Sequence, residues 1–169
     1  MSHSIPQTGP KLALSRFAQR LLAAQPELGA ELADPQPFTR AEMLNALEGR
    51  ADDELARGLR RLRNRVLLRV MARDLSGRAG LDEVCGTMTD LAEVAIESVL
   101  GDEDLIVIGM GKLGGRELNV SSDVDLVFLY RGSAEAQERY ERAGRRLIRL
   151  LSEPTADGFV FRVDMRLRP

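Results

Sequence analysis

The sequence predicts an α+β protein in which a helical N-terminal region is followed by a small mixed β-sheet. Two observations predict this class: apolar residues recur at helical spacing through the first hundred residues, and short apolar runs separated by glycines begin after Gly101. A further helical pattern lies between the last two of these runs. We therefore expect a helical lead-in region over 1–100 and a mixed α/β core over 101–169.

The first region is expected to contain several short helices and two long ones. Helical spacing begins near Leu12, and three prolines between positions 26 and 37 divide the pattern into short segments. A long helix is predicted from Asp52 or Asp53, either of which can cap it, to about residue 74. After a break at 76–80, a second long helix is predicted over 81–99, packed against the first.

Opposite charges follow these two helices. Residues 57–78 hold eight arginines and one acid, whereas residues 79–105 hold eight acids and no base. The arginine run has two interpretations, a patch for phosphate or nucleic acid and a solvated helix beside an acidic partner, and the second is the commoner one. We therefore expect the two helices to attract each other, and we assign the arginines no site.

The overall composition narrows the classes of function. The 169 residues carry 24 basic and 26 acidic side chains and no tryptophan, so neither charge nor aromatic stacking favours a nucleic-acid or membrane partner. Cys85 and His3 are the only residues of their types, which excludes an internal disulfide and a Cys/His metal site. The sequence shows neither a signal peptide nor an 18-residue apolar run, so a cytoplasmic protein is expected.

The second region is expected to hold three strands and one helix. The strands are predicted over 105–109, 124–130 and 159–167, and the helix over 134–152. In the third strand, apolar residues alternate with the polar series Arg162, Asp164, Arg166 and Arg168. One face of this strand therefore packs, and the other is free for chemistry.

A glycine-rich loop follows the first strand. Residues 109–114 fit the pattern G-x-G-x-x-G, which in dinucleotide-binding folds is followed by a full helix and, about 20 residues on, by an acid. Only seven residues separate Gly115 from Asp123, too few for the crossover of that fold. A loop whose N–H groups face a triphosphate fits better. Its candidate phosphate-binding residues are Gly111, Lys112, Gly114 and Gly115, although a loop lysine can equally be solvated.

Three aspartates are the candidate catalytic and metal-binding residues. Asp123 and Asp125 are two residues apart, which places both carboxylates on one face of a strand, and Asp164 supplies a third acid from the last strand. Oxygen ligands of this kind suit Mg²⁺, and two such ions can bridge three carboxylates beside substrate phosphates. The alternative for Asp164 by itself is a surface strand with ion pairs.

Four neighbouring side chains are further candidates for phosphate binding. Arg162 and Arg166 flank Asp164 and can neutralise phosphate or hold the aspartate in place. Ser121 and Ser122 directly precede the first aspartate, and their hydroxyls can donate to a phosphate oxygen or cap the turn into the strand. Both interpretations of the serines stay open.

These motifs resemble the nucleotidyltransferases of the DNA polymerase β type, and more closely the bifunctional glutamine synthetase adenylyltransferase/adenylyl-removing enzymes. The resemblance rests on residues 109–119, 121–130 and 158–169, and it extends upstream through 60–77. It implies a nucleotidyltransferase-like core over 101–169. Because the family's proteins are several times longer than this chain, it also implies that the core is incomplete at its C-terminal end and that the chain is a fragment or a truncated product.

The family has two halves, one that attaches AMP to a tyrosine of glutamine synthetase and one that removes it by phosphorolysis and releases ADP. Segments 118–123 and 161–169 resemble the N-terminal, adenylyl-removing half. The resemblance implies that Asp123, Asp125 and Asp164 bind Mg²⁺, and that the glycine loop with Ser122 faces phosphates of ADP, ATP or inorganic phosphate. It further implies glutamine synthetase as the protein substrate and allows a PII-type nitrogen signal protein as a partner.

Two other functions fit the same residues. The chain can be another nucleotidyltransferase of the same fold that modifies a different protein or a small molecule. It can also be a catalytically silent fragment that only docks on glutamine synthetase or a PII-type protein through its helical half. One position departs from the family, because Val120 stands where an aromatic residue is usual, and this change is expected to affect packing only.

Overall fold

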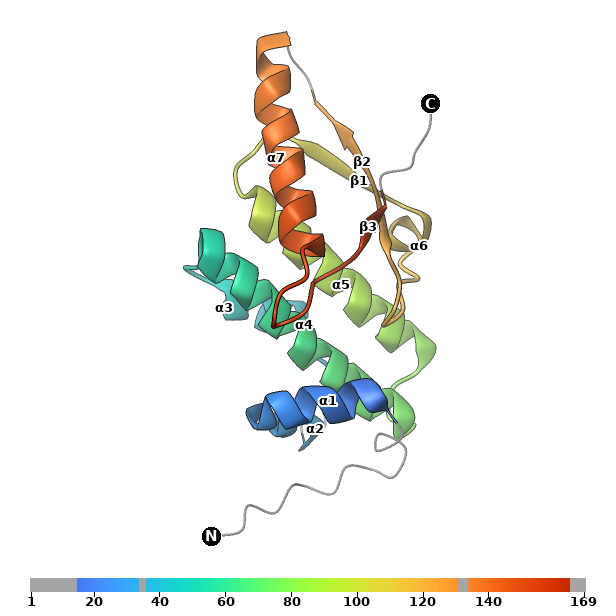
Figure 1. The fold of residues 1–169 in the computed structure, drawn as a ribbon. Coiled ribbons are helices and arrows are strands. Elements are labelled where there is room, and N and C mark those ends of the chain that lie inside the picture. Colours follow the sequence, from blue (N-terminus) through green and yellow to red (C-terminus); the bar gives the residue numbers. More distant parts are fainter. Residues whose placement is uncertain (1–14, 34–35, 131–133, 165–169) are drawn as a thin grey trace.

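The computed structural model describes residues 15–33, 36–130 and 134–164 of the chain (Figure 1). Its elements in chain order are α1 (Arg16–Ala24), the 3₁₀ helix η2 (Pro26–Gly29), α2 (Ala30–Ala33), α3 (Arg40–Leu47), α4 (Asp52–Leu75), α5 (Leu81–Leu100), β1 (Ile106–Met110), α6 (Gly111–Gly114), β2 (Val124–Leu129), α7 (Ala134–Ser152) and β3 (Val163–Asp164). The predicted α+β class is confirmed. Within the described ranges, every helix is too short or too polar to span a bilayer.

The long helices α4 and α5 form the centre of the molecule (Figure 1). Their contact is apolar, since Leu59 and Val66 of α4 and Met88 and Leu91 of α5 are fully buried in one core. The prediction of both helices is therefore confirmed. The predicted cap is wrong: the N-cap of α4 is Ala51, which makes no side-chain capping bond and whose carbonyl accepts the N–H groups of the first turn.

Short helices pack around this pair, and side-chain caps fix where they begin. The N–H of Ala18 donates to Ser15 Oγ at 3.2 Å at the start of α1. Helix α3 begins with a capping box, in which Thr39 Oγ1 accepts the N–H of Glu42 and Glu42 Oε2 accepts the N–H of Thr39. Ala18 also packs on Leu68 of α4 in a small second cluster, which attaches α1 to the long helix.

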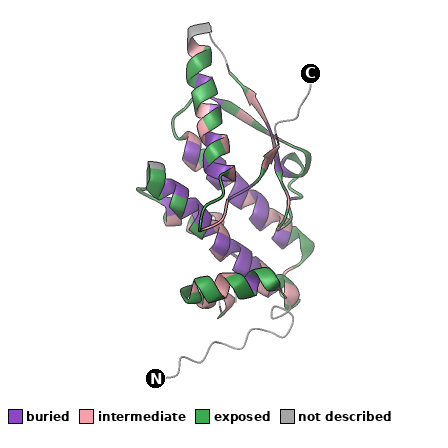
Figure 2. Ribbon diagram, in the orientation of Figure 1, coloured by how far each residue is buried: buried purple, intermediate pink, exposed green. Residues whose placement is uncertain are grey.

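The sheet has the order β1-β2-β3, with β1 antiparallel and β3 parallel to β2. One face packs on the helices, because Val124 and Leu126 of β2 are buried in the same core as Leu147 and Leu151 of α7 (Figure 2). On the opposite face, large apolar side chains of the first two strands are exposed: Ile106, Ile108, Met110 and Leu129. The core therefore lies on one side of the sheet and continues into the helical region.

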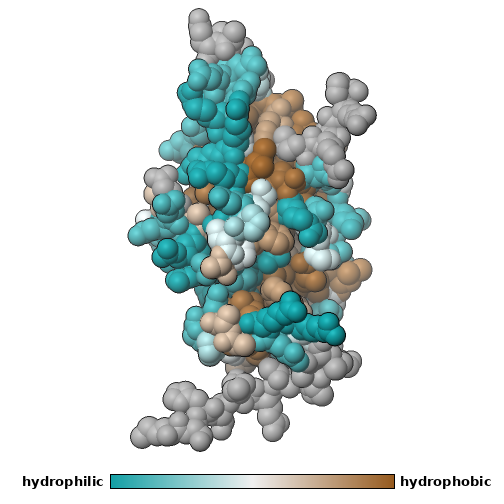
Figure 3. Space-filling view, in the orientation of Figure 1, coloured by the Kyte–Doolittle hydropathy of each residue, from teal (hydrophilic) through white to brown (hydrophobic). Residues whose placement is uncertain are grey.

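Helix α7 has the predicted span and crosses the sheet closely. A Cβ atom added to Gly144 would lie 3.0 Å from the ring of Phe128, so the glycine leaves room for the helix to approach β2. The outer side of α7 is hydrophilic (Figure 3) and carries i,i+4 ion pairs from Glu138 to Arg142 and from Glu141 to Arg145. This amphipathic pattern explains why the sequence predicted the helix correctly.

The third strand is shorter than predicted. Within the described residues it contains only Val163 and Asp164, and residues 165–167 of the predicted strand lie outside them. The amides of Val160 and Phe161 both donate to the carbonyl of Leu151 at the end of α7. These bonds hold the segment against the end of α7, where both side chains are buried. The predicted alternation of packed and exposed side chains is therefore wrong before residue 162.

The opposite charges of α4 and α5 meet at Arg73 and Glu83. Arg73 Nε binds Glu83 Oε1 at 2.6 Å and so joins the two helices. Other arginines of α4 pair with shorter helices, as Arg69 does with Glu31 of α2. Acids of α5 bind arginines from α3 and from the loop after α6: Arg40 contacts Glu93 and Glu97, and Arg116 contacts Asp90 and Glu93. The two helices pack as predicted, but much of their charge stabilises contacts with other elements.

Candidate functional site

The glycine loop lies against the aspartate strand. Gly111 follows β1 directly and has a positive φ of 53°, a conformation that favours glycine. A Cβ atom at this position would lie 2.7 Å from Asp125 Oδ2, and one at Gly114 would lie 2.6 Å from the carbonyl oxygen of Gly109. Only glycines therefore allow this tight turn, and the turn brings backbone groups beside the Asp125 carboxylate.

Two of the three candidate aspartates occupy neighbouring strands in register. Asp125 pairs with Met110 across the antiparallel ladder and with Asp164 across the parallel ladder. Residues paired in this way lie about 4.8 Å apart and point to the same face of the sheet. That face is the one that carries the exposed apolar residues of β1. The structure thus brings together Asp125, Asp164 and the glycine loop, as the sequence predicts.

Asp123 lies just before β2 and is bound by an arginine. Arg162 Nε contacts Asp123 Oδ1 at 2.5 Å, and Arg162 Nη2 donates to the carbonyl of Ser121 at 3.2 Å. Both charged side chains are about half exposed, at 61% for Arg162 and 48% for Asp123. An ion pair this exposed contributes little stability, at most about 1 kcal/mol, so a ligand can replace it.

The donor chemistry of the three aspartates suits Mg²⁺, since carboxylate oxygens are its usual protein ligands. Among the residues that the structure describes, however, no group of three or more acidic, histidine or cysteine side chains is placed to hold a metal ion. Asp123 is bound by Arg162 instead. Binding of a metal by all three carboxylates therefore stays a prediction, and it requires Asp123 to leave Arg162.

The remaining predicted phosphate ligands have varied surroundings. Lys112 lies exposed on α6. The Ser121 hydroxyl donates to Asn119 Oδ1 at 3.1 Å, and Ser122 Oγ accepts the N–H of Asn119 at 3.1 Å. These bonds form the turn before β2, which is the capping role considered for the serines. Asn119 organises this turn and was not among the predicted residues, although Asx residues are common in such turns. Arg166 lies outside the described residues.

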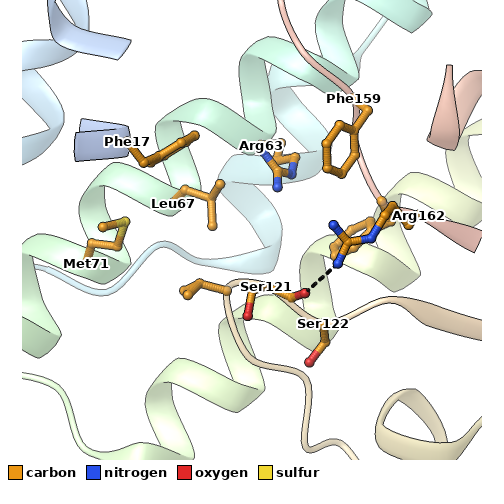
Figure 4. A pocket seen from close by; sticks show the side chains of 10 residues that line it. Phe17, Arg63, Leu67, Met71, Ser121, Ser122, Phe159 and Arg162 are labelled. Carbon is orange, nitrogen blue, oxygen red and sulfur yellow. Dashed lines mark hydrogen bonds between the residues drawn. The ribbon is translucent and has the colours of Figure 1, made fainter. Parts of the chain in front are cut away.

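A pocket that the sequence did not predict lies beside Ser121 and Arg162 (Figure 4). Its volume is about 290 Å³, and its walls include Phe17 of α1 and Arg63 of α4. The Arg63 guanidinium lies 4.8 Å from the centre of the Phe159 ring. Burial, together with the positive charge of Arg162, lowers the pKa of Arg63 to about 10. Arg63 belongs to the arginine run to which the sequence analysis assigned no site.

Comparison with known proteins identifies relatives. The family model described as glutamate-ammonia ligase adenylyltransferase matches residues 7–103 and 101–169. Three proteins named bifunctional glutamine synthetase adenylyltransferase/adenylyl-removing enzyme are similar to this chain. The protein from Nitrosomonas europaea is 46% identical over 94% of the chain, that from Burkholderia pseudomallei 45% over 94%, and that from Thioalkalivibrio sulfidiphilus 45% over 92%.

The chain spans about a fifth of the length of these relatives, 21% for the first two and 20% for the third. The resemblance inferred from the glycine loop, the aspartates and the last strand is confirmed by these matches. Because the two matches of the family model together cover nearly all of the sequence, the chain belongs to the glutamate-ammonia ligase adenylyltransferase family.

Proposed function

We propose that this chain forms part of the N-terminal, adenylyl-removing half of such an enzyme. The reaction is the Mg²⁺-dependent phosphorolysis of the AMP–tyrosine bond in glutamine synthetase, with release of ADP. The observation that carries the proposal is the placement of Asp125, which is in register with Asp164 and lies beside Gly111 of the glycine loop. The names of the relatives support glutamine synthetase as the protein substrate. We place this activity in the cytoplasm, with a PII-type protein as a further partner.

In this proposal the aspartates hold Mg²⁺, and bound Mg²⁺ neutralises charge on the reacting phosphates. An oxygen of inorganic phosphate forms a bond to the phosphorus of the AMP group. The bond from this phosphorus to the tyrosine oxygen breaks, and the tyrosine oxygen takes up a proton, so the products are ADP and free tyrosine. Gly111, Gly114 and Gly115 present backbone N–H groups to the phosphates.

Basic and hydroxyl side chains complete the phosphate site in this proposal. Arg162 would donate to a phosphate oxygen once its bond to Asp123 is broken, and Asp123 would then be free to bind Mg²⁺. Lys112, Ser121, Ser122 and Arg166 are the other phosphate ligands. The exposure of the Asp123–Arg162 bond supports this exchange, because a half-exposed ion pair costs little to break.

The open face of the sheet supports a protein substrate. Ile106 and Leu129 form a cross-strand pair, are 49% and 48% exposed, and lie on the same face as Asp125. Ile108 and Met110 continue this apolar strip up to the aspartate. Contiguous exposed apolar side chains beside a site typically bind another protein surface, and here they suit the segment around the modified tyrosine.

The test uses a chimaera in which this chain replaces the matching segment of the Nitrosomonas europaea relative. Incubation with adenylylated glutamine synthetase, phosphate and Mg²⁺ should release ADP. Asp125→Asn should reduce the rate by more than the roughly 10–100-fold that loss of an outer-shell metal partner costs. Asp102→Asn, at an exposed acid in the turn after α5, is the matched control and should leave the rate unchanged. Turnover that persists in Asp125→Asn would refute the assignment.

One observation favours a second function, a chain that docks without catalysis. Asp123 is bound by Arg162, and the described residues hold no group of three side chains placed for a metal. Calorimetric titration of the chain with Mg²⁺–ADP separates the two proposals. Absence of binding, together with retained contact with glutamine synthetase, would establish docking alone. Nucleotide binding without ADP release from adenylylated glutamine synthetase would instead indicate a nucleotidyltransferase with another substrate.

A further inference from the structure

We propose that the pocket between α1, α4 and the segment before β3 binds a small organic anion. The charged group of this ligand contacts Arg63 and Arg162, and its apolar part packs against Phe17, Leu67 and Met71 (Figure 4). The pocket borders the aspartates, because Arg162 also binds Asp123 and because Ser121 and Ser122 belong to its lining. The observations that carry this proposal do not use the reaction proposed above.

The shape of the pocket suits a small molecule. Its volume of about 290 Å³ lies near the lower end of the range for ligand pockets, roughly 300–1,000 Å³. Residues from distant parts of the sequence form its walls: Phe17 comes from α1, Leu67 and Met71 from α4, and Phe161 from the segment after α7. Folding therefore creates a cavity with a largely apolar wall, which favours a ligand with an apolar or aromatic body.

The charge inside the pocket favours an anion. Nε of Arg63 is buried and has no hydrogen-bond partner among the residues that the structure describes. The ring of Phe159 lies beside its guanidinium but supplies no negative charge. The positive charge of Arg162 lies close enough to lower the pKa of Arg63. A buried N–H group without a hydrogen-bond partner is costly, and a bound carboxylate, phosphonate or phosphate that accepts from Nε of Arg63 would offset this cost.

Polar groups at one end of the pocket indicate where the charged group lies. Arg162 lies at this end and donates to the carbonyl of Ser121, and Arg63 lies between Arg162 and Phe17 in this view (Figure 4). Phe17 and Met71 are at the other, apolar end. The two arginines and the apolar wall thus define a ligand with one charged end, so inorganic phosphate alone would leave the apolar part unfilled.

The test uses phenylphosphonate as the probe and methyl NMR of the full chain as the readout. We expect phenylphosphonate to shift the methyl signal of Met71, which lines the pocket, and to leave that of Met88 in the α4–α5 core unchanged. Arg63→Met should weaken binding about tenfold or more, as expected for loss of a charged hydrogen bond. Arg61→Met, an exposed arginine on the same helix, should bind as the unchanged chain does.

Two reference ligands complete the test. Benzyl alcohol lacks the charge and inorganic phosphate lacks the ring, so both should bind at least about tenfold more weakly than phenylphosphonate. Equal binding of either reference ligand would overturn the proposal, as would a Met71 signal that does not respond. Unchanged affinity in Arg63→Met, or an equal loss in Arg61→Met, would also overturn it. The NMR signals report folding directly, so a misfolded variant is recognised, and the Met71 response in the unchanged chain decides the question independently of any variant.

Discussion

The helical region and the sheet segment use charged side chains in different ways. In the helical region Glu31 is 7% exposed and binds Arg69 of α4 at 2.5 Å, and Arg69 also binds Glu42 of α3 at 2.9 Å. In the sheet segment Arg162 and Asp123 bind each other at a half-exposed surface. Buried charges must keep their partners, whereas exposed ones can exchange them. The buried cluster around Glu31 therefore stabilises the fold, whereas the exposed pair of Arg162 and Asp123 remains available to ligands.

Glu31 should show the largest effect on stability. Glu31→Gln removes the negative charge that the buried Arg69 and the neighbouring Arg65 both bind, so we expect a loss of about 3 kcal/mol, at the low end for a broken buried ion pair. Urea unfolding measures this as a lower midpoint with an unchanged slope. Glu27→Gln, an exposed acid in η2, should change stability by less than about 0.5 kcal/mol. Equal effects of the two changes would contradict the structural role of Glu31.

The two regions also differ in how much of their structure could be predicted from the sequence. Spacing of apolar residues correctly predicted α4, α5 and α7, because each helix buries a continuous stripe. The alternation of residues 159–167 predicted that Asp164 lies on a strand, and the structure places it on β3 in register with Asp125 of β2. These features follow from local periodicity and from chain topology.

Features that depend on distant packing could not be predicted. The third strand was predicted too long, because the alternation of apolar and polar residues cannot show that the amides of Val160 and Phe161 donate to the carbonyl of Leu151. The pocket beside Arg63 forms only when α1 places Phe17 near α4, and no local sequence pattern predicts that contact. The bond between Arg162 and Asp123 likewise joins residues from different segments of the chain.

Replacing one glycine in each region should change the stability of the fold in opposite directions. Gly111→Ala places a Cβ 2.7 Å from Asp125 Oδ2 at a positive φ, so we expect a loss of about 1–2 kcal/mol and displacement of the carboxylate. Gly86→Ala in α5 meets nothing within 4 Å and should instead stabilise the chain by about 0.5–1 kcal/mol. Thermal unfolding followed by circular dichroism measures both. A Gly111→Ala chain as stable as the Gly86→Ala chain would show that the loop does not require this conformation.

The link between α4 and α5 should depend on pH. The bond from Arg73 lowers the pKa of Glu83 below its ordinary value near 4.5. A lowered pKa in the folded state means that the pair stabilises the fold above about pH 4.5, and that this stability is lost as the pH falls through the folded pKa. Glu83→Gln should therefore cost about 1 kcal/mol at pH 7 and less at pH 3. A difference that stays constant between these two pH values in urea unfolding would contradict this.

The smallest effect that we expect is on Mg²⁺ affinity, and it tests whether the exposed charges of the sheet segment are available to ligands. Arg162 competes with a cation for Asp123, so Arg162→Gln should strengthen Mg²⁺ binding to the chain. Because the pair is half exposed and worth less than about 1 kcal/mol, the gain should be below about fivefold. Salt screens exposed charges, so the gain should shrink further at about 1 M NaCl, where the Debye length is roughly 3 Å.

The double variant Arg162→Gln/Asp123→Asn isolates this competition. If the arginine acts only through Asp123, the gain in Mg²⁺ affinity measured by calorimetry should vanish when Asp123 has lost its charge. A gain that persists in the double variant would mean that Arg162 acts by general repulsion of cations from the aspartate face. An affinity that falls in Arg162→Gln would mean that the arginine positions Asp123 for the metal, and that the exposed ion pair is part of the site's structure after all.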